Sequence, residues 1–381
     1  MDNTSYIEIS RSALENNLDY IRAKKKAKTK LSLVVKGNAY GHGIDTYGPL
    51  AASLGVNHFS VFDAHEAYQL KRSLSSPAEI MIMGMITDDQ IPWAIEEGVG
   101  FFVFEEHRLK QTIAVAKALG QKARIHLELE TGMNRTGFVK NQWSHLYKLI
   151  QDNSEHLILE GLCTHFAGAE SVANHLRISK QLKAFKEGRK TFKPLEPHYI
   201  HAACSAAFLR FPKSQYDLVR VGILQYGFWP SVETYIATEG MHENATDPLQ
   251  RLISWKSRIM NVKEVAKGEY IGYGTSYLAT QTTKVAAVPV GYSHGFSRSL
   301  SNAGRALVRG TRVGVIGVVN MNVMMLDVSH IPSVEVGDEV VLIGEQGNQS
   351  ISVSSFSEYS DQMNYELLTR LPQDIPRYIT D

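Results

Sequence analysis

Two patterns of hydrophobic and polar residues divide the chain. In roughly the first two thirds, short apolar runs alternate with longer stretches whose apolar residues recur at helical spacing. The stretches 64–72, 106–119 and 171–189 show this helical spacing. The apolar runs lie at 31–36, 58–62, 80–83, 100–104, 124–130, 159–165, 198–203 and 218–223. Eight strands in alternation with helices predict a (β/α)8 barrel, whereas a doubly wound open sheet usually has fewer strands.

The pattern changes near residue 247. Short strand-like runs separated by glycines occupy 253–265, 283–290, 305–308, 312–319, 324–328 and 339–343, with one short helical stretch at 354–362. This spacing is typical of a mainly antiparallel β domain. The polar segment 239–248 has no clear periodicity and predicts the boundary. We therefore expect a barrel domain at 1–246 and a C-terminal β domain at 247–381.

Composition narrows the class of protein. The net charge of +1 gives no overall field that would attract nucleic acid or an acidic membrane surface. No apolar run approaches the ~20 residues that span a bilayer, and the N-terminus has no signal-peptide pattern. Cys163 and Cys204 lie in apolar stretches without metal-type spacing, which predicts reduced thiols in a cytoplasmic protein.

Polar residues stand where a barrel places its chemistry, at the carboxyl ends of strands. Lys36 ends the first predicted strand, and Arg135 follows the fifth. His165 ends the sixth strand, Ser205 follows the seventh, and Arg220 lies on the eighth. In isolation each residue has a commoner structural explanation, such as a helix N-cap for the serine. Together they predict one active site.

The lysine favours carbonyl chemistry. Burial lowers the pKa of a lysine, and a neutral amine can condense with an aldehyde. Barrels often bind a phosphate between the loops after their last two strands, where Ser205 and the pair Gly222-Ile223 stand. A phosphorylated aldehyde such as pyridoxal 5'-phosphate fits both features.

Several motifs in order along the chain resemble those of the alanine racemase family. They are VVKGNAYGHG at 34–43, TGMNRTGF at 131–138, THFA at 164–167, SAA at 205–207, VRVGI at 219–223, YGTSY at 273–277, PVGY at 289–292 and NYE at 364–366. A set that extends over both predicted domains is far more specific than any single motif.

The resemblance implies a role for each residue. Lys36 would bind pyridoxal phosphate and act as one base, while Tyr273 would be the second base on the opposite face of the substrate α-carbon. Because a tyrosine hydroxyl ordinarily keeps its proton at neutral pH, Tyr273 would need positive charge nearby, from His165 and Arg220. Arg220 would contact the pyridine nitrogen and, being always protonated, weaken the ring as an electron sink. Arg135 would contact the cofactor's phenolic oxygen or the substrate carboxylate.

The remaining implied contacts are with the phosphate and the substrate. The phosphate would be surrounded by Tyr40, Ser205, Gly222, Ile223 and Tyr365. Tyr292 and Met321 would line the substrate entrance and pocket. A head-to-tail homodimer is also implied, in which Tyr273 and Met321 complete the partner's site.

Some residues depart from the family pattern. Glu128 stands where many members have a lysine that carries a carbamate, and its carboxylate could pair with Arg135 without carbon dioxide. Asn322 replaces a usual aspartate, Ser293-His294 replaces Asp-Gly, and Cys204 replaces a frequent asparagine. Because these changes lie near the entrance or the phosphate end, a racemase of serine or of broad specificity is an alternative.

Other classes fit less well. A metal hydrolase could use His126, Glu128, His165, His198 and His201, but no H-E-x-x-H motif is present, and we expect no metal site. A related-fold decarboxylase would also use the lysine, but the Tyr273 segment favours racemisation. A non-catalytic pyridoxal-phosphate carrier would be a barrel without the second domain. The resemblance to the alanine racemase family therefore implies a pyridoxal-phosphate racemase that interconverts L- and D-alanine and supplies D-alanine for cell-wall precursors.

Overall fold

The computed structural model describes residues 3–240, 246–357 and 364–381. The chain forms two compact units. The barrel unit consists of Ala13–Lys36 and Gly48–Arg251, and the sheet unit consists of Met1–Ser12, Gly37–Tyr47 and Leu252–Asp381.

The barrel unit contains a closed ring of parallel strands in chain order. Within the described residues these strands are β2 (Lys30–Val34), β3 (His58–Val61), β4 (Glu79–Ile82), β5 (Gly100–Val103), β6 (Ala123–Glu128), β7 (Leu157–Cys163), β8 (Tyr199–His201) and β9 (Leu218–Val221). Pairing of β2 with β9, Leu31 beside Val219, closes the ring. The predicted (β/α)8 barrel is confirmed, with each strand close to its predicted bounds.

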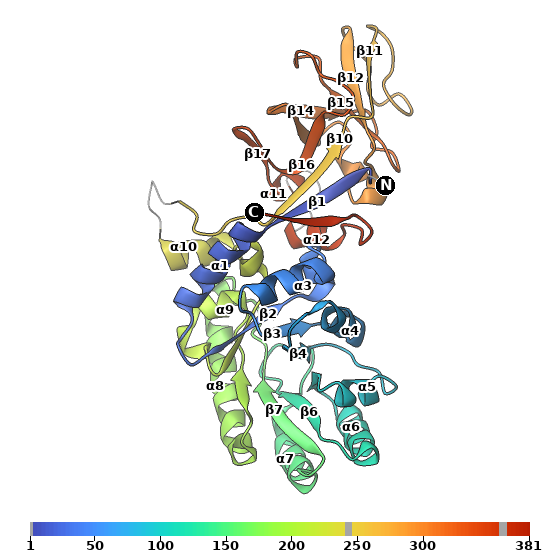
Figure 1. The fold of residues 1–381 in the computed structure, drawn as a ribbon. Coiled ribbons are helices and arrows are strands. Elements are labelled where there is room, and N and C mark those ends of the chain that lie inside the picture. The colour runs from blue at the N-terminus through green and yellow to red at the C-terminus, as the bar shows by residue number, and fades with distance from the viewer. Residues whose placement is uncertain (1–2, 241–245, 358–363) are drawn as a thin grey trace. The chain divides into compact units, whose positions relative to one another are not determined.

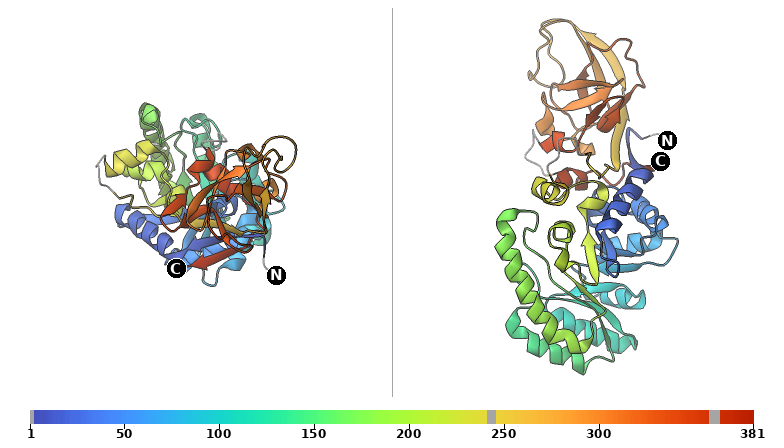
Figure 2. Two further views of the ribbon diagram at one scale, coloured as in Figure 1. Left: turned by 90° about the horizontal axis from the view of Figure 1, so that it is seen from above. Right: turned by 90° about the vertical axis from the view of Figure 1, so that its left-hand side faces the viewer.

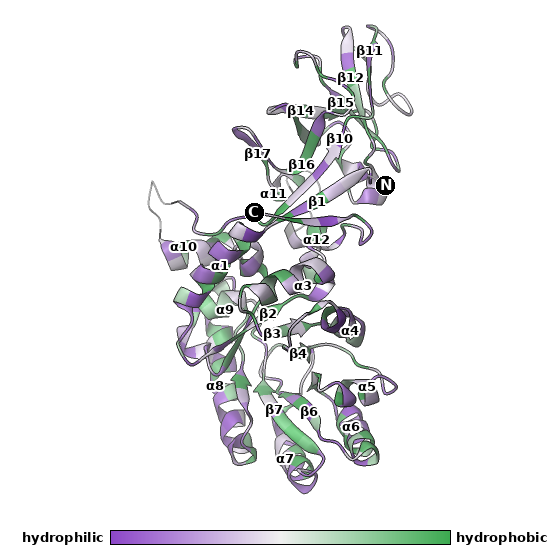
Figure 3. Ribbon diagram, viewed as in Figure 1, coloured by the Kyte–Doolittle hydropathy of each residue, from purple (hydrophilic) through white to green (hydrophobic). Residues whose placement is uncertain are grey.

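Helices lie outside the barrel strands (Figures 1 and 2). They are α4 (Ala64–Ser73), α5 (Ile91–Glu96), α6 (Glu106–Leu119), α7 (Trp143–Asp152), α8 (His175–Phe192), α9 (Ser205–Arg210) and α10 (Val232–Glu239). Sequence signals set their ends: α6 begins where the Glu105 carboxylate accepts from the backbone N–H groups of His107 and Arg108, and stops at left-handed Gly120. Figure 3 shows hydrophobic residues along β6 and β7 and mixed character on α8. The helices therefore bury one face and leave the other in water.

The sheet unit is built around a mainly antiparallel sheet. Its order in the described chain is β11-β12-β15-β14-β13-β16-β10-β1-β18, with β17 paired to β16. The strands are β1 (Ser5–Ser10), β10 (Ile253–Arg258), β11 (Asn261–Val265), β12 (Thr283–Val288), β13 (Arg305–Val308), β14 (Thr311–Ile316), β15 (Met324–Asp327), β16 (Glu339–Gln346), β17 (Gln349–Ile351) and β18 (Arg377–Thr380). The expected antiparallel β domain is confirmed. The single run expected at 253–265 is wrong, because the chain changes partner from β16 to β12 between β10 and β11.

The N-terminal strand belongs to the sheet unit. β1 pairs antiparallel with β10, Ile7 opposite Trp255, and parallel with β18, Ile7 beside Arg377. The two units therefore do not divide at a single point near 246/247, since β1 and the segment Gly37–Tyr47 are grouped with the C-terminal sheet. Such pairings join residues far apart in the chain, so no local pattern announces them. Part of the predicted boundary (241–245) and of the predicted last helix (358–362) lies outside the described residues.

The remaining helices are short or connect the units along the chain. They are α1 (Arg11–Lys24), α2 (Lys36–Tyr40), α3 (Ile44–Ser53), α11 (Ser354–Ser357) and α12 (Asn364–Thr369). Across the part of the chain that is described, no helix has the length and apolar character needed to cross a membrane. Cys163 is a buried free thiol in the barrel, and Cys204 is a partly buried one.

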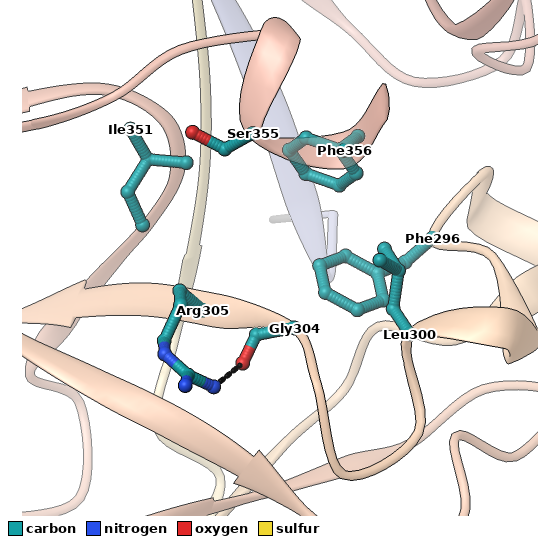
Figure 4. A pocket seen from close by; sticks show the side chains of 7 residues that line it. All are labelled: Phe296, Leu300, Gly304, Arg305, Ile351, Ser355 and Phe356. Atoms are coloured by element: carbon teal, nitrogen blue, oxygen red, sulfur yellow. Dashed lines mark hydrogen bonds between the residues drawn. The ribbon is translucent and has the colours of Figure 1, made fainter. Parts of the chain in front are cut away.

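The sheet unit has a small pocket that is lined mainly by apolar side chains (Figure 4). It is lined by Phe296, Leu300, Gly304, Arg305, Ile351, Ser355 and Phe356. Its volume of about 10 Å³ is close to the room that one water molecule needs. It is too small for a substrate or cofactor.

Candidate active site

Lys36 lies two residues beyond the end of β2, the first barrel strand. The backbone N–H of Val35 donates to Ser60 O at 2.9 Å, which keeps the chain beside β3 up to the lysine. Lys36 is solvent accessible, yet the pKa of its amine is lowered, first by desolvation and then by the positive charges of Arg135 and Arg220. Glu66 opposes this shift. The shift favours the neutral amine, which is the nucleophilic form.

The segment after Lys36 is left-handed. Residues 37–40 have φ values of 63°, 54°, 53° and 53°, so α2 is one left-handed turn and not a continuing right-handed helix. This conformation costs roughly 1–2 kcal/mol for each residue that carries a side chain. Local contacts hold it: Gly41 N–H donates to Gly37 O at 3.0 Å, and Ile44 N–H donates to Asn38 Oδ1 at 2.8 Å.

Gly41 cannot be replaced by a larger residue without movement of the backbone. Its φ is +82°, and an added Cβ would lie 1.9 Å from Leu368 O. Arg377 donates from Nη2 to Gly41 O at 3.0 Å. The turn that carries Tyr40 is therefore packed against the α12 segment and tied to β18 within the sheet unit.

Arg220 is a cation buried inside the barrel. It lies on β9, is 4% exposed, and donates from Nη2 to Thr164 O at 2.9 Å. The same nitrogen lies 3.5 Å from His165 Nδ1. Burial lowers the pKa of His165 to about 3, with further lowering by Arg220, Arg135 and Lys36. The neutral form of His165 is therefore favoured at physiological pH, so of the two predicted suppliers of positive charge Arg220 is the one that stays protonated.

Arg135 and Glu128 belong to one loop that begins at the end of β6 and returns to it at Phe138. Phe138 N–H donates to Glu128 O at 2.9 Å, and Glu130 N–H donates to Phe138 O at 3.0 Å. The Glu128 side chain is 5% exposed. Burial raises its pKa, although a hydrogen bond from Thr136 and the charges of Arg220 and Arg135 act against that shift. Arg135 itself is exposed in the loop.

The predicted phosphate residues of the barrel lie together. Ser205 begins α9, as expected, and is 6% exposed. Its Oγ accepts a hydrogen bond from Gly222 N–H at 2.9 Å, which joins the segments after β8 and β9. Ile223 follows and is 8% exposed. A lysine amine, a buried cation and this polar pair, all at the carboxyl end of one barrel, fit a phosphorylated aldehyde with an aromatic nitrogen.

The other predicted residues lie in the sheet unit. Tyr273 is 74% exposed, in a loop between Gly272 and Gly274, which both have positive φ. Tyr292 and Met321 are 41% and 55% exposed. Backbone hydrogen bonds bring their segments together, from Tyr292 N–H to Asn320 O at 3.0 Å and from Ser293 N–H to Met321 O at 3.0 Å. Tyr40 is partly buried, and Tyr365 is 37% exposed.

Two departures from the family pattern contact each other. Asn322 Nδ2 donates to Ser293 Oγ at 2.9 Å, and Ser293 Oγ donates to the backbone oxygen of Met321 at 2.7 Å. Sequence analysis identified each substitution singly, because residues so far apart in the chain carry no sign of their contact.

The histidines of the alternative metal site do not assemble. His126 Nδ1 and His201 Nε2 are hydrogen bonded at 3.1 Å, and His198 lies instead beside Glu160, at 3.7 Å. Among the described residues, no group of three or more such side chains could hold a metal ion.

The fold and the site define a two-domain barrel enzyme with a lysine amine at the carboxyl end of its strands. Models of the alanine racemase N-terminal and C-terminal domains match residues 9–230 and 252–379. An alanine racemase of Leptospira interrogans serovar copenhageni is 36% identical over 384 residues, which is 99% of this chain and 96% of that protein. One from Halothermothrix orenii is 33% identical over 376 residues, 98% of this chain and 96% of that protein.

Solved structures of alanine racemases have the same fold as this chain. Alanine racemase of Clostridium difficile 630 matches with a TM-score of 0.91 and 27% identity, covering 100% of this chain and 96% of that one. The alanine racemase of Bacillus anthracis with bound L-Ala-P matches with a TM-score of 0.89 and 30% identity, with the same coverage. The chain belongs to the alanine racemase family.

Proposed function

We propose that this protein interconverts L- and D-alanine with pyridoxal 5'-phosphate held on Lys36. The observation that carries the proposal is the amine of Lys36, with its lowered pKa, at the barrel end that also holds Arg220, in a chain that matches the alanine racemase family throughout. When bound, the cofactor supplies an electron sink that makes the substrate α-hydrogen acidic.

Each proton carrier would serve one face of the substrate. Lys36 would hold the cofactor and then accept or return the α-proton on its side. Tyr273 would do so on the other side, since inversion by two bases needs one group on each face. Arg220 would place a permanent cation at the pyridine nitrogen, and neutral His165 would connect to Arg220 by hydrogen bonding. Arg135 would orient the phenolic oxygen or the substrate carboxylate.

The remaining site residues would bind and select. The phosphate would be held by Tyr40, Ser205, Gly222, Ile223 and Tyr365, of which Ser205 and Gly222 already share a hydrogen bond. Tyr292 and Met321 would line the substrate entrance. A racemase of serine or of broad specificity is the second candidate, which rests on the sequence departures at Asn322 and Ser293, whose side chains are hydrogen bonded to each other.

The proposed assembly is a head-to-tail homodimer in which Tyr273 and Met321 act in the partner's site. The exposure of these two large side chains supports the proposal. The proposed setting is the cytoplasm, where the product D-alanine would serve cell-wall precursors.

The test combines a spectrum with a stereospecific assay. The purified protein should show the absorbance band of a lysine-bound cofactor, and borohydride should fix that cofactor covalently. Lys36→Ala should lose the fixed cofactor and turnover, whereas Lys28→Ala, at an exposed lysine nearby in the chain, should keep both. Tyr273→Phe should lose racemisation but keep solvent exchange of the α-proton chiefly for the enantiomer that Lys36 deprotonates. Release of carbon dioxide from the substrate, or no D/L exchange with alanine or serine, would contradict the proposal.

A further inference from the structure

A pair of imidazoles lies behind Arg220 inside the barrel. His201 on β8 and His126 on β6 are 0% and 1% exposed, and Arg220 on β9 is 4% exposed. An Arg220 Nη1 atom contacts His201 Nδ1, and His201 Nε2 lies 3.1 Å from His126 Nδ1. The ring of Phe102 packs on all three, with its centroid 5.9 Å from each imidazole centroid and from the guanidinium carbon.

The pair exists because the strand between the two histidines has no side chain at that level. Gly161 on β7 is the register partner of His126. An added Cβ at Gly161 would lie 2.1 Å from His126 Nδ1 and 2.7 Å from His201 Nε2. The glycine therefore leaves the space in which imidazoles from β6 and β8 meet.

The direction of each hydrogen bond follows from the arginine. A guanidinium only donates, so Nδ1 of His201 must accept. A neutral imidazole has one donor and one acceptor nitrogen, so Nε2 of His201 carries the proton and donates to His126 Nδ1. His126 must then carry its own proton on Nε2. Any other placement of protons sets two donors or two acceptors against each other.

We propose that His126 is a positioning residue for catalysis: by accepting the Nε2 proton of His201 it holds that ring in place, and the ring in turn holds Arg220. The His126 ring contacts His201, which in turn contacts the guanidinium of Arg220. No role in the proposed function has been given to His126. The proposal rests on the proposed function, because Arg220 serves catalysis only if it meets the cofactor.

Electrostatics agrees with the geometry. Burial lowers the pKa of His201 well below its ordinary value, and Arg220 and His126 lower it further. Burial likewise lowers the pKa of His126, with smaller effects from His58, Arg220 and Arg124. Both rings therefore stay neutral at physiological pH, which the chain of donors and acceptors requires.

The test is to observe the ring protons directly in the full-length holoenzyme. Two-bond nitrogen–proton spectra of protein labelled with [15N]histidine should show both rings neutral and protonated at Nε2. His126→Phe keeps a ring of similar size but removes the acceptor. The His201 proton should stay on Nε2, because Arg220 still needs Nδ1 as an acceptor, but its resonance should shift and broaden once that proton has no partner. Turnover should fall about tenfold while the cofactor stays bound, which is the usual scale for an unsatisfied buried donor.

Two further variants separate hydrogen bonding from packing. His126→Asn places an amide oxygen near the former Nδ1 position and should retain the His201 signal and most of the turnover. His58→Asn alters another buried barrel histidine, which contacts Ser32 and not Arg220, and should change neither readout.

Several results would overturn the proposal. They are a His201 ring protonated at Nδ1 or doubly protonated in the wild type, equal turnover in His126→Phe and wild type, or equal losses in His126→Phe and His126→Asn. If His126→Phe does not fold, the wild-type spectrum still decides the tautomers. Failure of the proposed function would give a different result: the wild-type protein would hold no cofactor after borohydride treatment and would not racemise its substrate.

Discussion

Burial determines the charge of the barrel's histidines. His58 is 2% exposed, and desolvation lowers its pKa to about 4, with Lys30 and Arg124 adding to the shift and Glu79 opposing it. His42 in the sheet unit behaves alike, with a pKa of about 4 that burial produces. Like His165, these two buried imidazoles are therefore neutral hydrogen-bonding groups.

This neutrality predicts acid sensitivity. A histidine in the unfolded chain titrates near ~6.5. Below that pH the unfolded chain therefore binds protons that the buried histidines of the folded chain do not bind. His58 therefore contributes its full stability above about pH 6.5, and that contribution is lost as pH falls toward about 4. The loss is at most about 1.4 kcal/mol per pH unit for each such histidine.

The experiment is urea unfolding between pH 7.5 and 5. His58→Asn preserves an acceptor for Ser32 and removes the titrating ring, so the slope of unfolding free energy against pH should decrease by about one proton. His330→Asn, at an exposed position, is the matched control. Equal slopes for wild type and His58→Asn would contradict the prediction.

Glu128 offers a second test at the scale of one residue. If its carboxylate anchors Arg135 in place of a carbamate, Glu128→Gln should weaken cofactor binding and reduce turnover about tenfold, because an amide cannot carry the charge. Wild-type activity should not depend on added bicarbonate. Exposed Glu155→Gln is the control. Unchanged binding and turnover in Glu128→Gln would reject the idea.

At the scale of elements, the left-handed turn after Lys36 is the feature on which the site depends most. The segment that follows the strand is tightly packed there, and the space around its glycine Gly41 differs from that around a glycine elsewhere in the sheet unit. Gly41 faces Leu368 O at a distance that excludes a side chain, whereas Gly268, also at positive φ, has nothing within 4 Å of an added Cβ.

The two glycines make a matched pair for mutation. Gly268→Ala should cost only the backbone penalty, about 1 kcal/mol of unfolding free energy. Gly41→Ala should cost about 3 kcal/mol or more, because overpacking adds to that penalty. Urea unfolding measures both. Equal losses would show that the turn tolerates movement of the α12 segment.

For the whole molecule, the proposed homodimer predicts rescue between two inactive variants. Lys36→Ala and Tyr273→Phe disable residues that would come from different subunits of one site. A mixed dimer would then contain one intact site and one with both changes. Random assembly should restore about a quarter of wild-type activity, since half of the dimers are mixed and each has one working site.

The measurement is racemase activity after the two proteins are coexpressed. Coexpression of Lys36→Ala with Lys28→Ala controls for assembly, because it places a wild-type tyrosine in every site. No rescue in the mixed sample, with normal dimers by size, would mean that lysine and tyrosine act from the same chain.

Much of the fold could be read from the sequence because it is encoded locally. Parallel barrel strands are buried on both faces, so β3, β5 and β9 are buried along their whole length, and β5 has no polar side chain at all. The positions of the predicted strand ends were enough to predict Lys36, Ser205 and Arg220 at one end of the barrel. The N-terminal strand β1 was not predicted, because its partners β10 and β18 lie far along the chain.

The sequence by itself determined the barrel, the β domain and the residue types of the site, since periodicity and strand ends are properties of neighbours along the chain. Only the tertiary structure decided that His165 is neutral, that Ser293 contacts Asn322, and that Gly161 leaves room for His126 to meet His201. Charge state and hydrogen-bond direction depend on burial and on partners from other strands, and these exist only once the chain has folded.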